Sequence, residues 1–168
     1  DISTVALPTP LVTEDPVGSL IYEVNRSGGI NFAGDTDRFT LSVDPNQTLT
    51  VLVTPTSGGL WPTVELRDPS NTLLGSNSAS AAGQKALLQT LSTTTPLAGT
   101  YTIAVAGVGA ALGDYTVRVI LNSALEREAN IAGGGNNTPG TAQNIDASLI
   151  ALGTPTAPAS RGAVVGQT

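Results

Sequence analysis

Two aspartates that lie two residues apart are the clearest candidates for chemistry in this sequence. Asp35 and Asp37 occur in Gly-Asp-Thr-Asp, directly before a stretch with the alternation of a β-strand. Carboxylates at this spacing in a turn can offer oxygens to one Ca²⁺ ion, which takes roughly six to eight oxygen ligands. In a second interpretation, Asp35 caps the turn by accepting hydrogen bonds from backbone N–H groups, and Asp37 is solvated. The sequence leaves both interpretations open.

The single tryptophan, Trp61, is the second candidate for a binding role. It follows two glycines and a leucine and precedes Pro62, which predicts a loop or the edge of a strand. An exposed indole ring there can stack on a sugar or anchor a protein partner. In the alternative interpretation, the ring of Trp61 closes one end of a hydrophobic core.

The residue types that most catalytic sites need are missing from the chain. It contains no His and no Cys, which removes the commonest general base, thiolate nucleophiles and thiolate metal sites. The only lysine, Lys85, lacks the surroundings of a Ser-Lys pair, and no Gly-x-Ser-x-Gly motif occurs. We therefore expect a protein that is not an enzyme.

The acidic charge balance excludes further classes of partner. Seven Lys and Arg against thirteen Asp and Glu give a formal net charge of −6. Nucleic acid and anionic membrane surfaces are poor partners for such a chain, because both attract clustered basic residues. No apolar run approaches the ~20 residues of a membrane span. The charge is compatible with a bound cation such as Ca²⁺, and equally with simple solubility.

Short segments in which apolar and polar side chains alternate recur between residues 19 and 121. In 100–106, for example, Tyr101, Ile103 and Val105 alternate with small or polar residues. A period of two predicts half-buried β-strands. The clearest of these segments are 37–43, 47–54, 63–67, 100–106 and 114–121, and shorter candidates are 19–24, 72–75 and 85–91.

The segments between these strands carry turn residues, as in Asp44-Pro45-Asn46, where proline presets φ for the second turn position. Short strands with frequent turns and little helical periodicity predict an all-β antiparallel β-sandwich of about eight strands. The one expected helical patch, 123–129, is about two turns long and would serve as a connector.

Composition divides the chain into three parts. Residues 1–18 contain three prolines and predict an extended lead-in, 19–130 form the sandwich module, and 131–168 begin as a Gly- and Asn-rich linker. Ser-Leu-Ile at 148–150 repeats Ser-Leu-Ile at 19–21, so the tail either opens a following similar module or adds strands to this one. Because the chain contains no Met, we expect a processed or excised piece of a larger protein.

Several motifs follow one another in a fixed order over roughly the middle three-fifths of the chain. They are GDTDRFTL (34–41), NQTLTVLV (46–53), PTVELRDPSNTLLGS (62–76), AGTYTIAVAG (98–107) and GDYTVRVIL (113–121). Their order and spacing resemble the bacterial pre-peptidase C-terminal domain family, with its Gly-Asp-x-Asp-x-aromatic opening and its closing Gly-x-Tyr-Thr-Leu strand. The tail NNTPGTAQNID (136–146) is similar to the lead-in that often precedes such a domain.

The resemblance implies a jelly-roll-like sandwich in a secreted or cell-surface bacterial protein. It implies a non-catalytic accessory or spacer module whose partners are neighbouring domains of the same polypeptide. The alternative function is a module that binds an extracellular polysaccharide or a fibrous protein. Some members of the family bind calcium through the matching aspartates and acidic residues of the preceding segment. This extends the candidate calcium site from Asp35 and Asp37 to Glu14 and Asp15.

Overall fold

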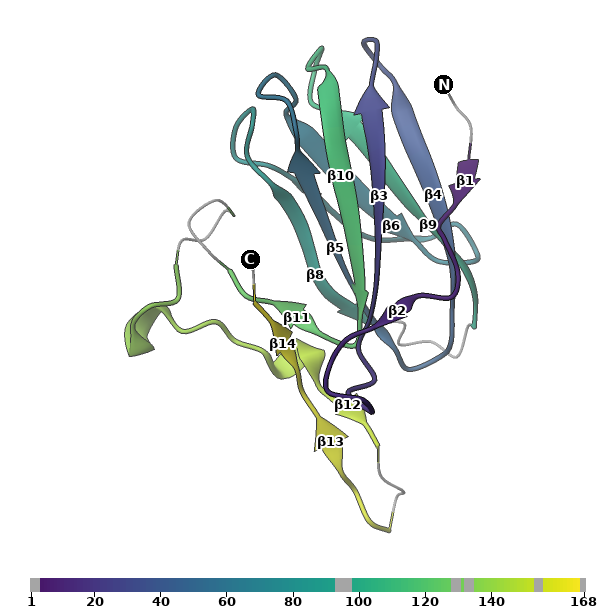
Figure 1. Cartoon of the computed structure of the whole chain (residues 1–168), viewed down its shortest axis with the longest axis vertical. Coiled ribbons are helices and arrows are strands. Elements are labelled where there is room, and N and C mark those ends of the chain that lie inside the picture. Colours follow the sequence, from purple (N-terminus) through teal and green to yellow (C-terminus); the bar gives the residue numbers. More distant parts are fainter. Residues whose placement is uncertain (1–3, 93–97, 128–130, 132–134, 153–155, 167–168) are drawn as a thin grey trace.

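Two five-stranded β-sheets pack face to face and form the body of the molecule (Figure 1). The computed structural model describes residues 4–92, 98–127, 131, 135–152 and 156–166. Sheet A has the strand order β1-β4-β9-β6-β7, and sheet B has the order β2-β3-β10-β5-β8. This architecture confirms the predicted all-β, jelly-roll-like sandwich.

The strands of both sheets correspond closely to the alternating segments of the sequence. Sheet A consists of β1 (Thr4–Ala6), β4 (Thr36–Val43), β9 (Gly99–Gly107), β6 (Pro62–Arg67) and β7 (Leu73–Ser78). Sheet B consists of β2 (Val12–Thr13), β3 (Tyr22–Ile30), β10 (Gly113–Leu121), β5 (Thr48–Pro55) and β8 (Ala86–Ser92). The eight predicted strands appear as β3 to β10, while β1 and β2 come from the lead-in and pair with β4 and β3.

The hydrophobic core lies between the two sheets and follows from the period of two. In β6, the side chains of Val64 and Leu66 are fully buried, whereas those of Glu65 and Arg67 point to the outer face of sheet A. The same alternation puts Tyr101 and Tyr115 in the core. The outer faces of the sheets are therefore where ligands and other segments of the chain can bind.

The first long strand begins later than predicted, at Tyr22 instead of residue 19. Leu20 has a positive φ of 59°, and the Ser19 hydroxyl accepts a hydrogen bond from the Ile21 N–H group, so this segment is a turn. The strand continues through Gly28, where the Tyr115 ring packs against its backbone. A Cβ at Gly28 would lie 2.5 Å from the Tyr115 hydroxyl oxygen, so only glycine leaves room for the ring.

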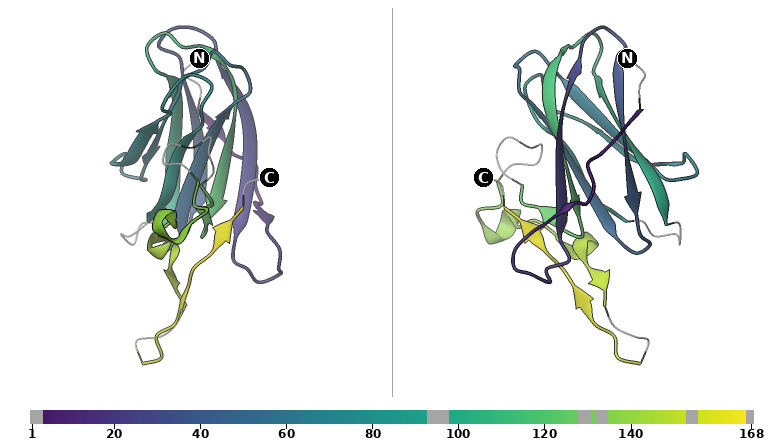
Figure 2. Two further views of the ribbon diagram at one scale, coloured as in Figure 1. Left: turned by 90° about the vertical axis from the view of Figure 1, so that its left-hand side faces the viewer. Right: turned by 45° about the vertical axis from the view of Figure 1, so that its right-hand side comes forward.

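The C-terminal segment packs against the outer face of sheet B (Figure 2). It contributes β11 (Ala124–Leu125), β12 (Ile150–Ala151), β13 (Ser160–Arg161) and β14 (Val164–Val165). β14 pairs in parallel with β11, and β12 and β13 form a small antiparallel pair that extends away from the sandwich. A second apolar cluster, here called the outer cluster, holds this segment on the sheet. Its buried members are Ile21, Leu52, Leu87, Ile120, Leu125 and Ile131.

The prediction of a helix at 123–129 is wrong for its described part, 123–127. Ala124 and Leu125 form a strand instead, and Leu125 is fully buried in the outer cluster. Contacts with β14 and sheet B override the weak local helical pattern; residues 128 and 129 lie outside the described residues. The helical turns of the described chain are η1 (Pro139–Thr141) and η2 (Asp146–Ser148). Within that part of the chain, no helix has the length and apolar character needed to cross a membrane.

Candidate functional site

Asp35 lies in the turn between β3 and β4 and is almost completely buried. Its Oδ2 atom accepts a hydrogen bond of 2.8 Å from the Asn31 N–H group, and its own N–H group donates to the Phe32 carbonyl. The hydrogen bond from Asn31 holds the pKa of the Asp35 carboxyl below its usual value. Asp35 thus has the turn-capping role that one interpretation of the sequence gave it.

Asp37 lies two residues further along, in β4, and binds a core tyrosine. Its Oδ2 atom accepts a hydrogen bond of 2.6 Å from the Tyr115 hydroxyl. Burial of Tyr115 and the neighbouring Asp37 carboxylate together raise the pKa of this hydroxyl, so Tyr115 remains a donor. Asp37 is half-buried and not simply solvated, and it joins the opening Gly-Asp-Thr-Asp motif to the closing Gly-Asp-Tyr-Thr motif.

Glu14 and Asp15 lie far from this pair, in the turn between β2 and β3. The Glu14 N–H group donates to the Ile21 carbonyl, whereas Asp37 lies beside Gly28. Ile21 and Gly28 are seven residues apart along the strand, which is about 23 Å at the usual rise per residue. The structure brings Asp35 and Asp37 together and places the other two carboxylates at the opposite end of β3 (Figure 1). In the described residues, no group of three or more acidic side chains is arranged to hold a metal ion.

Calcium binding at Asp35 and Asp37 stays a prediction, with a thermal test. A cation that binds only the folded chain raises its melting temperature, Tm. If the site forms, millimolar calcium raises Tm relative to chelator, and Asp37→Asn removes the increase because it removes a charged ligand. Asp44→Asn, an exposed aspartate in another turn, serves as the control and keeps the increase. A Tm that is the same with calcium and with chelator would contradict the prediction.

Trp61 lies directly before β6 and is fixed along one edge of its ring. Its Nε1–H group donates a hydrogen bond of 2.7 Å to the Ala79 carbonyl, and about a third of the residue (36%) is exposed. The neighbouring Leu60, which is fully buried, fills the end of the core. The exposed part of the ring is open to a ligand, so a binding role for Trp61 stays a prediction.

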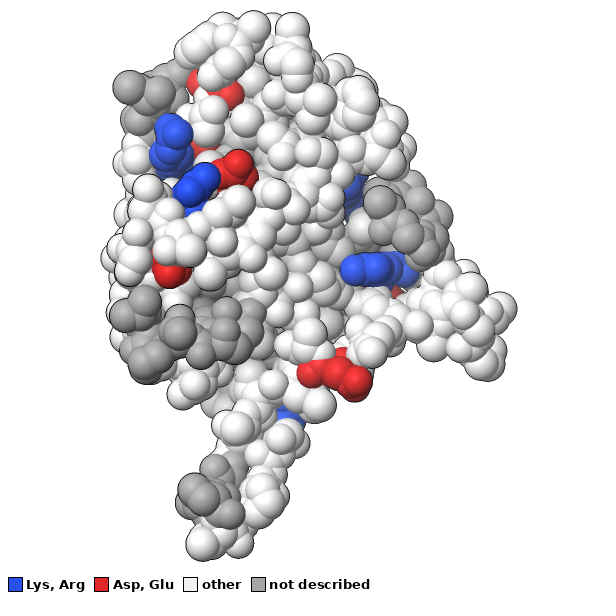
Figure 3. Space-filling view, turned by 180° about the vertical axis from the view of Figure 1, so that it is seen from behind, with Lys and Arg blue, Asp and Glu red and all other residues white. Residues whose placement is uncertain are grey.

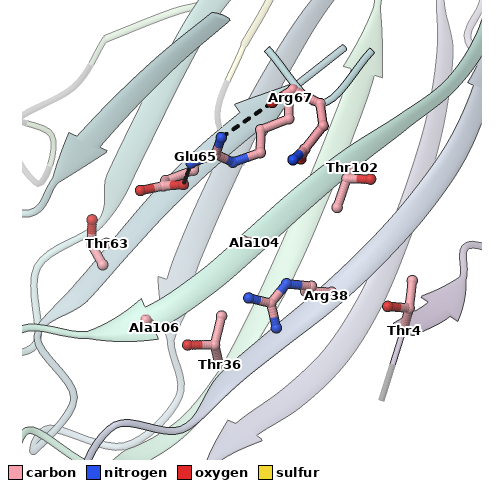
Figure 4. A pocket seen from close by; sticks show the side chains of 10 residues that line it. Thr4, Thr36, Arg38, Thr63, Glu65, Arg67, Thr102, Ala104 and Ala106 are labelled. Atoms are coloured by element: carbon pink, nitrogen blue, oxygen red, sulfur yellow. Dashed lines mark hydrogen bonds and ion pairs between the residues drawn. The ribbon is translucent and has the colours of Figure 1, made fainter. Parts of the chain in front are cut away.

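A groove on the outer face of sheet A was not foreseen from the sequence (Figure 4). It has a volume of about 620 Å³ and crosses β4, β9 and β6, with further lining from β1 and from Asn71 in the turn after β6. These three strands are consecutive in the sheet although they are far apart in the sequence. Their outward-facing side chains, which alternate with the core residues, therefore meet on one surface.

The hollow of the groove results from short side chains on its central strand. Ala104 of β9 lies opposite Arg38 of β4 on one side and Glu65 of β6 on the other. In the next row, Ala106 lies between two threonines. Neighbouring strands are about 4.8 Å apart, so Arg38 and Glu65 stand on backbones about 10 Å apart with only methyl groups between them.

The charged residues in the groove differ in how they are bound. The Arg67 Nη2 atom lies 2.9 Å from Glu65 Oε2, and its Nη1 atom donates to the Asn71 carbonyl at 3.2 Å. Arg38 extends over the groove toward β9 (Figure 4) and forms no ion pair or hydrogen bond with any described residue. Figure 3 shows this side of the molecule, where a few basic and acidic side chains lie together in a largely uncharged surface.

The comparisons with known proteins identify similar folds. No family model matches the chain, and no curated protein matches it. The solved structures that it resembles include the PliG lysozyme inhibitor of Aeromonas hydrophila, with 18% identity, 71% of this chain and 96% of that chain covered, and a TM-score of 0.43. Another is the Yersinia pseudotuberculosis-derived mitogen, with 8% identity, coverage of 60% and 86%, and a TM-score of 0.46.

One of these similar structures comes from the family that the motifs indicated. It is the pre-peptidase C-terminal domain of collagenase from Bacillus anthracis. The two chains are 18% identical, with 58% of this chain and 88% of that chain covered and a TM-score of 0.45.

Proposed function

We propose that this chain is a non-catalytic accessory module of a secreted or cell-surface bacterial protein and that the groove of sheet A binds an extracellular polymer. The observation that carries the proposal is the pair of alanines at the centre of the groove, Ala104 and Ala106. Alanine is disfavoured in strands and adds little to cross-strand packing. Stability therefore does not account for two alanines here, whereas room for a ligand does.

The chemistry of the groove supports binding without catalysis. Its one carboxylate, Glu65, is paired with Arg67, and the chain has no His or Cys to act beside it. The remaining lining is mainly threonine hydroxyls, which can both donate and accept hydrogen bonds. The volume lies within the range of roughly 300–1,000 Å³ that is usual for ligand sites. The sequence motifs support the secreted or cell-surface setting.

Ala104→Trp tests the groove, because a tryptophan at this position fills the space between Arg38 and Glu65. We expect binding to the cognate polymer to fall by at least about tenfold, which corresponds to about 1.4 kcal/mol. Stability should change little, because aromatic residues are favoured on strands. The measurement is a binding assay against immobilised acidic and neutral polysaccharides and against collagen fibres, with Tm measured in parallel.

Thr116→Trp provides the matched control for this experiment. Thr116 lies on β10 and alternates with the core residues Tyr115 and Val117, so its side chain faces outward on the opposite sheet. The control should bind as the unmodified chain does. Equal binding by the chain with Ala104→Trp would show that the polymer binds elsewhere. A chain that binds no polymer in the assay would leave only the spacer role.

A further inference from the structure

We infer that the ligand of the groove is a polysaccharide that carries carboxylate groups and that Arg38 is the residue that binds them. This inference rests on the proposed polymer-binding function and specifies its ligand. Of the two arginines in the groove, Arg67 is already held by Glu65 and by the Asn71 carbonyl. Arg38 has no such partner among the described residues. Its guanidinium group is therefore available to a ligand.

Among the described residues, the immediate cross-strand neighbours of Arg38 carry no carboxylate. Across the strands it faces Thr4 of β1 and Ala104 of β9. The adjacent Asp37 lies on the other face of β4, where it accepts the Tyr115 hydroxyl. This is notable in a chain with thirteen acidic and seven basic residues, because a basic side chain is expected to find an acidic partner by chance. A planar carboxylate can accept two parallel hydrogen bonds from a guanidinium group.

The groove favours a carbohydrate over an extended peptide. Its three crossing strands, β4, β9 and β6, are each hydrogen-bonded to a neighbour on both sides. The backbone groups at the centre of the groove are therefore already paired within the sheet, and a peptide strand cannot add to them there. The only apolar side chains of the lining are alanines, so there is no pocket for a large apolar side chain. Threonine hydroxyls at 36, 63 and 102 suit the hydroxyl groups of sugars.

The charge of the groove favours carboxylates at low density over a heavily sulfated polymer. Two arginines against one glutamate leave one net positive charge. The Glu65 carboxylate would repel a ligand with several charges on each sugar, because like charges at close range cost free energy. One free guanidinium group matches one carboxylate, with neutral hydroxyl groups on either side. A single uronic acid unit of a polysaccharide has this composition, with one carboxylate and several hydroxyl groups.

The test is calorimetric titration of the full chain with a short oligogalacturonate and with the same oligomer after methyl esterification. We expect the acid to bind at least about tenfold more tightly than the ester, because only the acid can form charge-assisted hydrogen bonds. Arg38→Gln should weaken binding of the acid to the level of the ester and leave binding of the ester unchanged. Arg161→Gln, which removes the same charge from β13 in the C-terminal extension, should bind both as the unmodified chain does.

Two results would overturn this inference in different ways. If the acid and the ester bind equally well and Arg38→Gln changes neither, the groove does not select carboxylates, although loss of binding with Ala104→Trp would still support the proposed function. If neither oligomer binds, the ligand is not a uronic acid polysaccharide, and the proposed function then depends on the other polymers. Tm values for each variant show that a loss of binding is not a loss of folding.

Discussion

Replacement of Ile120 by alanine is expected to release the C-terminal segment from the sandwich and to lower the free energy of unfolding by about 2–5 kcal/mol. Ile120 is fully buried although it lies on the outer face of sheet B, because Leu125 and Ile131 cover it. Truncation to alanine leaves a cavity in a small cluster that holds the tail. We expect the tail to detach first, since the outer cluster packs it against sheet B.

Limited proteolysis combined with urea unfolding measures the two effects separately. Cleavage within 123–166 reports release of the tail, and the urea midpoint reports the stability of the whole domain. Val119→Ala is the matched control, because Val119 is the next residue on β10 and points into the core between the sheets. Val119→Ala should lower the urea midpoint, but the tail of this variant should not be cleaved faster than its sandwich. If the tail is not cleaved before the sandwich in the Ile120→Ala chain either, the tail does not unfold as a separate unit.

Most of the sandwich could be predicted because a strand that is buried on one face has an alternation of apolar and polar residues within its own short sequence. β9 is an example: Tyr101, Ile103 and Val105 indicated a strand over 100–106, and the structure has it at Gly99–Gly107. The period of two depends only on which face meets the core. Segments with a clear alternation were therefore placed to within about a residue or two, the usual uncertainty of strand ends.

The covered outer face of sheet B left a signal in the sequence that the alternation alone did not explain. Leu52 and Ile120 are apolar at positions where their strands should carry outward-facing polar residues, and both are buried in the outer cluster. Two such residues imply that another segment covers them. Which segment does so depends on distant contacts, and for the same reason local periodicity gave a helix where Ala124 and Leu125 form a strand.

The groove and the Asp37–Tyr115 hydrogen bond could not be derived from the sequence, because both depend on which strands become neighbours. Asp37 and Tyr115 are separated by 78 positions. The groove depends on β9 lying between β4 and β6. The sequence does show that Arg38 and Ala104 face outward on their own strands. It does not show that they face outward side by side.

Arg118→Ala is expected to cost about 3 kcal/mol of unfolding free energy at neutral pH. Arg118 forms an ion pair with Glu23, and the two side chains are 23% and 11% exposed. The Glu23 carboxylate also accepts a hydrogen bond of 2.7 Å from the Asn25 amide. Removal of the guanidinium group leaves the nearly buried Glu23 carboxylate with the hydrogen bond from Asn25 but without its ion pair. The cost is therefore mainly that of an uncompensated charge, not of a lost contact.

The cost of this substitution should depend on pH in a defined direction. Burial alone would raise the pKa of Glu23, but hydrogen bonds from Arg118 and Asn25 and the charge of Arg118 outweigh burial, so its pKa lies below the ordinary value of 4.5. In the unmodified chain, Glu23 thus stabilises the fold above the pKa of the unfolded chain, and this contribution is lost as the pH falls through the lower folded pKa. Without Arg118, neither its hydrogen bond nor its charge lowers the pKa of Glu23, so this pKa is expected to rise relative to that in the unmodified chain.

The difference in unfolding free energy between the two chains should therefore be largest near pH 7 and shrink as the pH falls through 4.5, because protonation of Glu23 removes the unpaired charge. Urea unfolding at a series of pH values measures this difference directly. Combining Arg118→Ala with Glu23→Gln provides the control, since a chain without the carboxylate has no such charge to neutralise and should lose the pH dependence. An equal cost of Arg118→Ala at pH 3 and at pH 7 would mean that lost packing of the arginine stem, rather than its charge, accounts for the destabilisation.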